Sequence, residues 1–159
     1  MATDKAELFG RHFVYEVWML LETRNCLSRG VIEKLVRNAL IESFCLHARA
    51  LVDFFNGKKG ADAAAFADDD YKPFPDGHDL GDLIVKVNTQ IVHLTGKRTA
   101  NQNEKINHRD RETLLQGVWA EVTNFLRHLK PEYHPLWPEL TWSPIVVGTS
   151  LGILTTTST

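Results

Sequence analysis

One stretch constrains the fold of this chain more than any other. Residues 37–55, RNALIESFCLHARALVDFF, form the longest run of good helix formers in the sequence. The stretch is apolar on nearly all sides, and helices of that kind are usually buried. Within this apolar run it also carries Glu42, His47, Arg49 and Asp53. It therefore predicts a central helix whose charged groups need partners.

Three of these charged residues share one face of the expected helix. At about 100° per residue, Glu42, Arg49 and Asp53 fall on a narrow stripe. Because Arg49 lies four residues before Asp53 and seven after Glu42, one guanidinium could contact both carboxylates. The stripe either faces solvent with an ordinary ion pair or forms a buried network, and the apolar surroundings favour the network. His47 lies on another face, where we expect a hydrogen-bonded core histidine rather than a catalytic base.

The remaining apolar pattern predicts three further helices. The first runs from Asp4 to Leu27 and is followed by the break Ser28-Arg29-Gly30. The central helix then spans Val31 to Asn56, with Gly57 in the usual C-terminal glycine position. A short link between two long helices indicates an antiparallel hairpin. The other two expected helices span Asp79 to Leu94 and His108 to Leu129.

The last part of the chain has a different character. Four prolines after residue 130 exclude another long helix, so an irregular arm is expected over residues 130–159. Trp137 and Trp142 should pack on the bundle or on a second subunit, and the terminal TTTST should be disordered. We therefore expect an all-α fold: an antiparallel up-down bundle of four main helices, residues 1–129, followed by the Pro- and Trp-containing arm.

Charge is distributed unevenly along the chain. Apolar residues make up 43% and charged residues 24%, as in a soluble globular protein. A net charge of -2 gives no global field toward nucleic acid or acidic lipid. Residues 62–82 nevertheless carry a net charge of -6, and residues 97–111 a net charge of +3. The basic segment either is simply solvated or contacts phosphates through Lys97, Arg98, Lys105, Arg109 and Arg111.

Several kinds of site have no sequence support. Cys26 and Cys45 fall in helical patterns without metal-ligand spacing, and the aspartates near residue 70 lack the glycine and glutamate of a calcium loop. Glycine-rich phosphate loops, the G-x-S-x-G elbow and Glu-x-x-His pairs are missing. We expect no metal and no cofactor. Without a signal peptide or an apolar run of about 20 residues, a cytoplasmic protein with no membrane association is expected.

One set of residues resembles a known family. Glu42-Ser43, His47-Ala48-Arg49 and Asp53-Phe54, followed by His93-Leu94-Thr95 and Arg98, are similar to motifs of uncharacterised bacterial helical proteins. Those proteins in turn resemble the HEPN superfamily, named for nucleotide binding in higher eukaryotes and prokaryotes. The resemblance implies an up-down helical bundle, often dimeric. It also implies an RNA-cleaving or nucleotidyltransferase-partner protein in toxin and defence systems.

The catalytic signature of HEPN ribonucleases is arginine, four to six residues, then histidine. Only Arg127 and His134 have this spacing here, and Pro131 lies between them. An RNase of this kind would need a histidine to move a proton and an arginine near the phosphate. His47 and Arg49 point to opposite sides of their helix, so they cannot serve one phosphate from a single subunit without another element.

Three functions therefore stay open. The chain is a HEPN-like helical module binding RNA, a nucleotide or a protein partner, a metal-independent ribonuclease active as a homodimer, or a non-catalytic structural interaction protein. Whether it is an enzyme is not decided by the sequence. The candidate catalytic residues are His47 and Arg49, and the candidate ligand-binding residues are Glu42, Asp53, His93 and Arg98.

Overall fold

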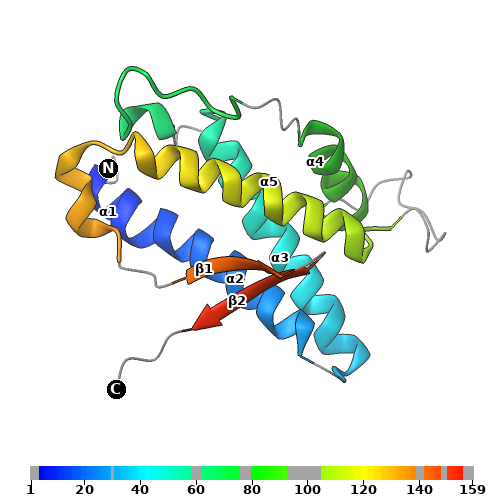
Figure 1. Cartoon of the computed structure of the whole chain (residues 1–159). Helices are drawn as coiled ribbons and strands as arrows, with labels where there is room; N and C mark the ends of the chain where they lie inside the picture. The colour runs from blue at the N-terminus through cyan, green and yellow to red at the C-terminus, as the bar shows by residue number, and fades with distance from the viewer. Residues whose placement is uncertain are drawn as a thin grey trace.

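The chain is mostly helical (Figure 1). The computed structural model describes residues 4–29, 31–58, 62–75, 80–92, 105–138, 142–147 and 150–155, and only the backbone of residue 92 and of the last two ranges. The expected all-α class is confirmed. Among the described helices, none is long and apolar enough to cross a membrane.

The first expected helix is present as one continuous helical segment. It comprises α1 (Lys5–Glu7), a π-helical stretch η1 (Leu8–Phe13) and α2 (Val14–Ser28). Asp4 caps its start, because the Asp4 Oδ1 accepts a hydrogen bond of 3.3 Å from the Ala6 N–H. The predicted apolar stripe is buried along Phe9, Phe13, Val17, Leu20 and Leu21.

The central helix, α3 (Lys34–Phe55), ends as its glycine predicts. Gly57 has a φ of 64°. Its N–H donates to the Phe54 carbonyl at 3.1 Å, and the Lys58 N–H donates to the Asp53 carbonyl at 2.8 Å. These two bonds make a Schellman motif, which satisfies the last carbonyls of the helix and needs a residue with positive φ.

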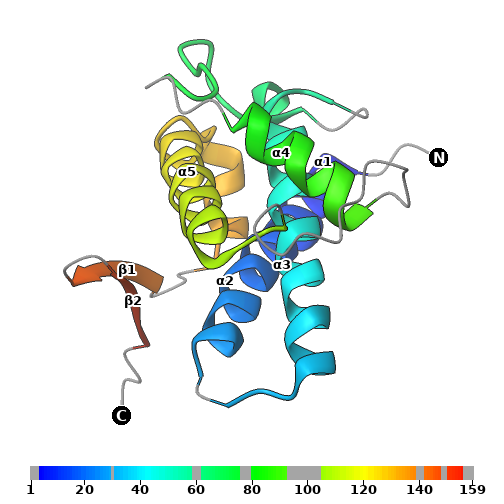
Figure 2. The same cartoon turned by 90° about the vertical axis from the view of Figure 1, so that its right-hand side faces the viewer.

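The helices α2 and α3 form the expected hairpin, and its turn projects beyond α5 (Figure 2). The expectation that α3 is buried along its length is wrong for its first half. Leu35 is 73% exposed and Val36 is 46% exposed, whereas the fully buried residues of α3 begin only at Phe44. The reason is that the projecting turns of α3 pack mainly on α2, with no other described helix covering their outer face.

The second half of the chain adds α4 (Gly81–Val87), continued by the π-helical η3 (Asn88–Val92), and α5 (His108–Arg127). The expected ends of the third helix at residues 79, 93 and 94 lie outside the described residues. A glycine allows α4 and α5 to approach closely. A Cβ at Gly117 would lie 2.8 Å from the Leu80 Cδ2, so a side chain there would force Leu80 to move.

An aromatic cluster forms the centre of the core. The Phe125 ring of α5 lies 5.2 Å from Phe13 of η1 and 5.6 Å from Phe54 of α3, measured between ring centroids. Phe66, just after the short 3-10 helix η2 (Ala63–Ala65), lies 5.9 Å from Phe54. The buried faces of three separate helical segments therefore meet around Phe125.

The C-terminal segment is more regular than expected. A 3-10 helix, η5 (Pro131–Leu136), is followed by an antiparallel hairpin of β1 (Trp142–Val147) and β2 (Ser150–Thr155). The expectation of an irregular arm is wrong for these residues, because prolines exclude a helix but the β-branched run around Val146 favours strands. The Trp137 ring lies 5.9 Å from Phe13, so this tryptophan packs on the helices as expected. The side chain of Trp142 lies outside the described residues.

Candidate anion-binding site

His47 holds two helices together. Its Nδ1 lies 2.7 Å from the Glu16 Oε2 of α2, and its ring meets the Tyr15 ring edge-on at 5.7 Å. The side chain is only 15% exposed. This arrangement agrees with the expected hydrogen-bonded histidine in the helix interface. It separates His47 from Arg49, which points to another side of α3.

The expected three-residue network is only partly formed. The Arg49 Nε lies 3.8 Å from the Asp53 Oδ2, and both side chains are mostly buried. Glu42 is exposed, and among the described residues no ion pair joins it to Arg49. The expected bridge over both carboxylates is therefore wrong. Two helical turns, about 10 Å along the axis, separate Glu42 from Arg49, and the guanidinium is turned toward Asp53. The candidates His93 and Arg98 lie outside the described residues.

The described part of the basic segment leads into the start of α5. Asn107 caps this helix in a capping box: its Oδ1 accepts from the Asp110 N–H, and Asp110 accepts from the Asn107 N–H, both at 3.0 Å. The Lys86 Nζ of α4 lies 2.7 Å from the Asp110 Oδ2. Burial acts to raise the pKa of the Asp110 carboxyl, but the hydrogen bonds from the Asn107 backbone and Lys86 outweigh it and hold that pKa below its ordinary value. The first turn of α5 is thus fixed in place.

A small pocket lies between α2, α3 and this first turn of α5. Its volume is about 60 Å³, and its mouth is open to solvent. The polar part of its wall comes from α2 and α5, and Phe44 of α3 contributes apolar surface. The lining residues are Arg24, Leu27, Ser28, Phe44, His108, Arg111 and Glu112.

Positive charge exceeds negative charge in this wall. Glu112 is the only carboxylate among the lining residues; its Oε1 lies 3.5 Å from the Arg24 Nε and 3.8 Å from the His108 Nδ1. Burial lowers the pKa of the Arg111 guanidinium, and the nearby Arg37 acts in the same direction. Two arginines and a histidine thus surround one glutamate, and an additional anion would stabilise the cluster.

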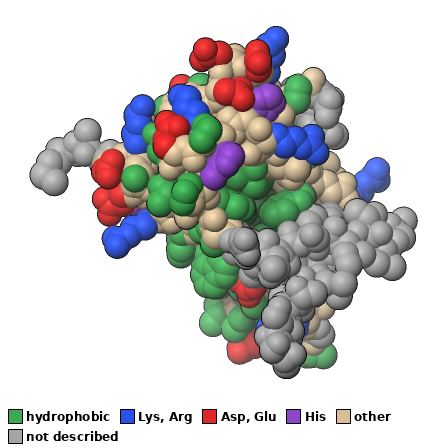
Figure 3. Space-filling view, turned by 60° about the vertical axis from the view of Figure 1, so that its left-hand side comes forward, with side chains coloured by type: hydrophobic (Ala, Val, Ile, Leu, Met, Phe, Trp, Pro, Cys, Tyr) green, Lys and Arg blue, Asp and Glu red, His purple; other side chains and the backbone are tan. Residues whose placement is uncertain are grey.

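This concentration of charge is local. Figure 3 shows Lys, Arg, Asp and Glu side chains of both signs intermixed on one face of the molecule, with apolar side chains between them. The net charge of -2 agrees with such a mixed surface. An anion would therefore be attracted by the pocket, rather than by a charged face of the whole protein.

Only part of this site could be predicted from the sequence. Arg111 belongs to the basic segment noted there, but no sequence pattern connects it with Arg24 or Glu112. A weak signal exists for Glu112, which lies four residues after His108 on the same helix face. Arg24 gives no such signal, because only the packing of α2 against α5 brings it to the pocket.

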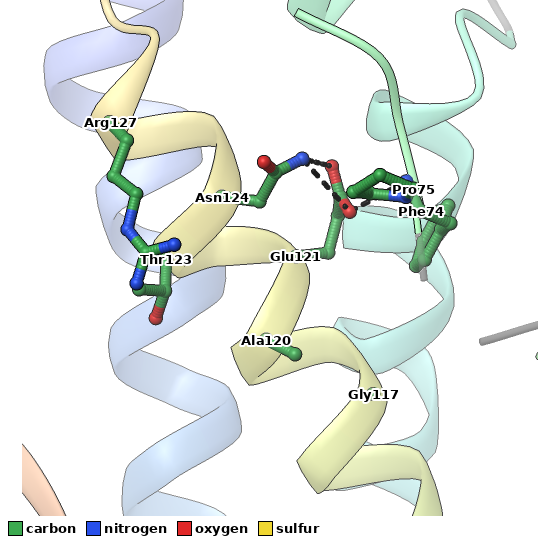
Figure 4. Close-up of a pocket in the computed structure, with 8 residues that line it drawn as sticks. All are labelled: Phe74, Pro75, Gly117, Ala120, Glu121, Thr123, Asn124 and Arg127. Atoms are coloured by element: carbon green, nitrogen blue, oxygen red, sulfur yellow. Dashed lines mark hydrogen bonds between the residues drawn. The ribbon is translucent and has the colours of Figure 1, made fainter. Parts of the chain in front are cut away.

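A second pocket lies further along α5 (Figure 4). Its volume is about 390 Å³. Glu121 forms part of its wall although it is only 2% exposed. Its carboxylate accepts hydrogen bonds from the Tyr71 O–H at 2.6 Å, the Phe74 N–H at 2.7 Å and the Asn124 amide at 3.2 Å. Burial raises the pKa of Tyr71, and the bond to Glu121 raises it further.

Sequence reasoning also missed Glu121. The residue lies between Val118, Val122 and Phe125 on the inward stripe of α5, which is the signal that could have identified it as a buried carboxylate. Among the described residues, no group of three or more His, Cys, Asp or Glu side chains could hold a metal ion. Cys26 and Cys45 are free thiols, and burial raises the pKa of Cys45 to about 12.

The comparisons with known proteins give no family assignment. No protein-family model matches the chain. No curated protein and no solved structure is significantly similar to it. The resemblance to HEPN proteins therefore remains an expectation from the sequence motifs.

Proposed function

We propose that this protein is a HEPN-like helical module that binds a phosphate-bearing ligand, RNA or a nucleotide, at the pocket between α2 and the start of α5. The observation that carries the proposal is the convergence of Arg24, Arg111 and His108 on one pocket that contains a single carboxylate, Glu112. The HEPN resemblance favours RNA or a nucleotide over other phosphate compounds, and it suggests a role in a toxin or defence system.

The chemistry of the pocket suits a phosphate group. Arginine guanidinium groups match phosphate oxygens in planar, two-point hydrogen bonds. The pocket also lies at the first turn of α5, a helix of 20 residues, where backbone N–H groups and the helix dipole favour negative charge. Glu112 restrains Arg24 from one side, so its guanidinium loses less freedom when it binds a phosphate.

The metal-independent ribonuclease is the second candidate, and His108 is the observation that favours it. Its imidazole is 79% exposed and lies at the mouth of the same pocket as two arginines. A histidine that exchanges protons beside guanidinium groups is the combination that RNA cleavage without a metal needs. Incubation of the protein with RNA in the presence of a metal chelator decides between the binding module and the ribonuclease. Cleavage that is lost in His108→Ala favours the enzyme.

Arg111→Met is expected to weaken the binding of single-stranded RNA or a nucleoside triphosphate by about tenfold or more, because a pocket-lining charge is lost while apolar bulk is kept. Fluorescence anisotropy at several salt concentrations measures the change. The slope of log K against log salt should become shallower by about one phosphate contact.

Arg109→Met is the matched control for this experiment. It removes the same charge from the same helical turn, but Arg109 is exposed and does not line the pocket. Its affinity should stay within about twofold of wild type. Equal losses in both variants would show diffuse attraction rather than a site. Wild-type protein that binds neither probe at low salt would refute the proposal and favour the structural interaction protein.

A homodimer and an antiparallel up-down arrangement of the four main helices complete the proposed organisation. The contacts of α3 with α2, α4 and α5 support the bundle. Exposed apolar side chains on the α2–α3 hairpin, among them Trp18 and Leu35, support a partner surface. Sedimentation at micromolar concentration should give about twice the chain mass of 18.0 kDa. A constant monomer mass over a hundredfold concentration range would exclude the dimer.

A further inference from the structure

We infer that the pocket beside Glu121 binds a linear polyamine, a ligand with primary ammonium groups at its ends. This site is separate from the proposed phosphate site and does not depend on it. The starting point is a buried negative charge without a counter-ion: Glu121 is 2% exposed, and among the described residues no Lys, Arg or His forms an ion pair with it.

The groups that hold Glu121 are all uncharged. They are the Tyr71 hydroxyl, the Phe74 backbone N–H and the Asn124 side-chain amide, at 2.6, 2.7 and 3.2 Å. These donors orient the carboxylate and satisfy its oxygens, but they leave its full negative charge in place. A buried charge of this kind is stabilised strongly by an opposite charge that comes close to it. An ammonium group entering the pocket would supply that charge.

The pocket has the shape and surface for such a group. Its walls include the Phe74 ring and Pro75 on one side and the small residues Gly117 and Ala120 of α5 on the other (Figure 4). An ammonium group next to Glu121 could also lie over the aromatic ring of Phe74, which attracts cations. Phe74 has a φ of 52°, a strained value for a residue with a side chain, and its N–H bond to Glu121 holds it there.

Acidic residues on a neighbouring segment extend the negative electrostatic field beyond the pocket. Residues 68–75 run along α5 in the opposite direction: the Asp68 N–H donates to the His128 carbonyl at 2.8 Å, and Asn124 donates to the Lys72 carbonyl at 3.1 Å. This segment carries the exposed acidic run Asp68 to Asp70. A ligand with several ammonium groups can therefore place one at Glu121 and another near the exposed aspartates, which a single cation cannot do.

Three side chains that can be cationic oppose this field, and none of them forms an ion pair with Glu121. The His128 Nδ1 lies 3.0 Å from the Asp68 Oδ1. Arg127 lines the pocket, but Figure 4 shows its guanidinium well apart from the Glu121 carboxylate. Lys72 is exposed on the segment opposite α5.

Isothermal titration calorimetry with spermidine and putrescine at low salt tests the inference. Wild-type protein is expected to bind both, with spermidine tighter, and 1,4-butanediol, which lacks the ammonium groups, should not bind. Glu121→Gln removes the charge but keeps an acceptor for the loop, and it should weaken binding by at least about tenfold. Wild-type protein that binds neither amine at millimolar concentration overturns the inference.

Two further variants separate the pocket from general effects. Ala120→Leu fills the pocket from an exposed helix position without touching the Glu121 hydrogen bonds, so it should reduce binding by a similar factor even if Glu121→Gln is unstable. Glu132→Gln removes one exposed charge from η5, outside the pocket, and should stay within about twofold of wild type. Equal losses in Glu132→Gln and Glu121→Gln, or unchanged binding in Ala120→Leu, would show nonspecific attraction and overturn the site.

Discussion

Replacing Phe125 by alanine is expected to lower the free energy of unfolding by about 3–5 kcal/mol, the usual cost of deleting a buried aromatic side chain. Phe125 is fully buried. Its ring lies 5.2 Å from Phe13, 5.6 Å from Phe54 and 5.6 Å from Tyr71, between ring centroids. These neighbours belong to three different segments, so the cavity cannot be closed by the movement of one element, and most of the lost packing energy should be observed.

Urea denaturation followed by far-UV circular dichroism measures this change. Val85→Ala is the control, since Val85 lies on α4, outside the α2–α3 hairpin, and is 63% exposed. It should change the free energy of unfolding by no more than about 0.5 kcal/mol. A loss below about 1 kcal/mol in Phe125→Ala, or equal losses in both variants, would contradict the position of Phe125 at the centre of the core.

Replacing Glu121 by alanine is expected to lower the free energy of unfolding by about 2–3 kcal/mol. The change leaves the buried Tyr71 hydroxyl and the Phe74 N–H without their acceptor. Each unsatisfied buried donor costs about 1–3 kcal/mol, although the removal of a buried charge offsets part of the loss. The segment over residues 68–75 should also detach from α5, because three of its hydrogen bonds involve Glu121 or Asn124.

Urea denaturation gives the free-energy change, and hydrogen exchange at the Phe74 amide shows whether the segment detaches. Tyr71→Phe is the smaller, matched change, because it removes one donor and leaves the carboxylate bonded to Phe74 and Asn124. It should cost about 1 kcal/mol. Full protection of the Phe74 amide in Glu121→Ala would mean that Glu121 does not hold the segment, contrary to the structure.

Much of the local structure follows from the sequence. The helix starts at Asp4 and Asn107 have side chains that accept hydrogen bonds from backbone N–H groups, and Gly57 can adopt the positive φ that ends α3. These are interactions between residues at most a few positions apart, so they depend on the residue types and their spacing alone. The inward position of Phe125 follows in the same way from helical periodicity.

The sequence also predicted on which helix face charged side chains lie, but not which of them form ion pairs. Helical periodicity placed Glu42, Arg49 and Asp53 on one face, and the structure joins only Arg49 to Asp53, at 3.8 Å. The periodicity gives the angle of a side chain around its helix, but not how far a neighbouring helix extends to cover it. The exposure of Leu35 could not be predicted for the same reason: the α2–α3 hairpin extends beyond α5, so its end is left uncovered.

The candidate sites were decided by tertiary structure. His47 contacts Glu16 on the neighbouring helix, and Arg24 contacts Glu112 across the pocket. The Glu121 carboxylate accepts a hydrogen bond from the Phe74 backbone N–H. Each of these pairs joins residues far apart in the chain. The sequence by itself determined that α2, α3 and α5 form, that α3 ends before Gly57, and which helix faces are apolar, because those properties depend on neighbours along the chain. Which polar groups meet depends on how the helices pack, because hydrogen bonds and ion pairs require contact at about 3–4 Å.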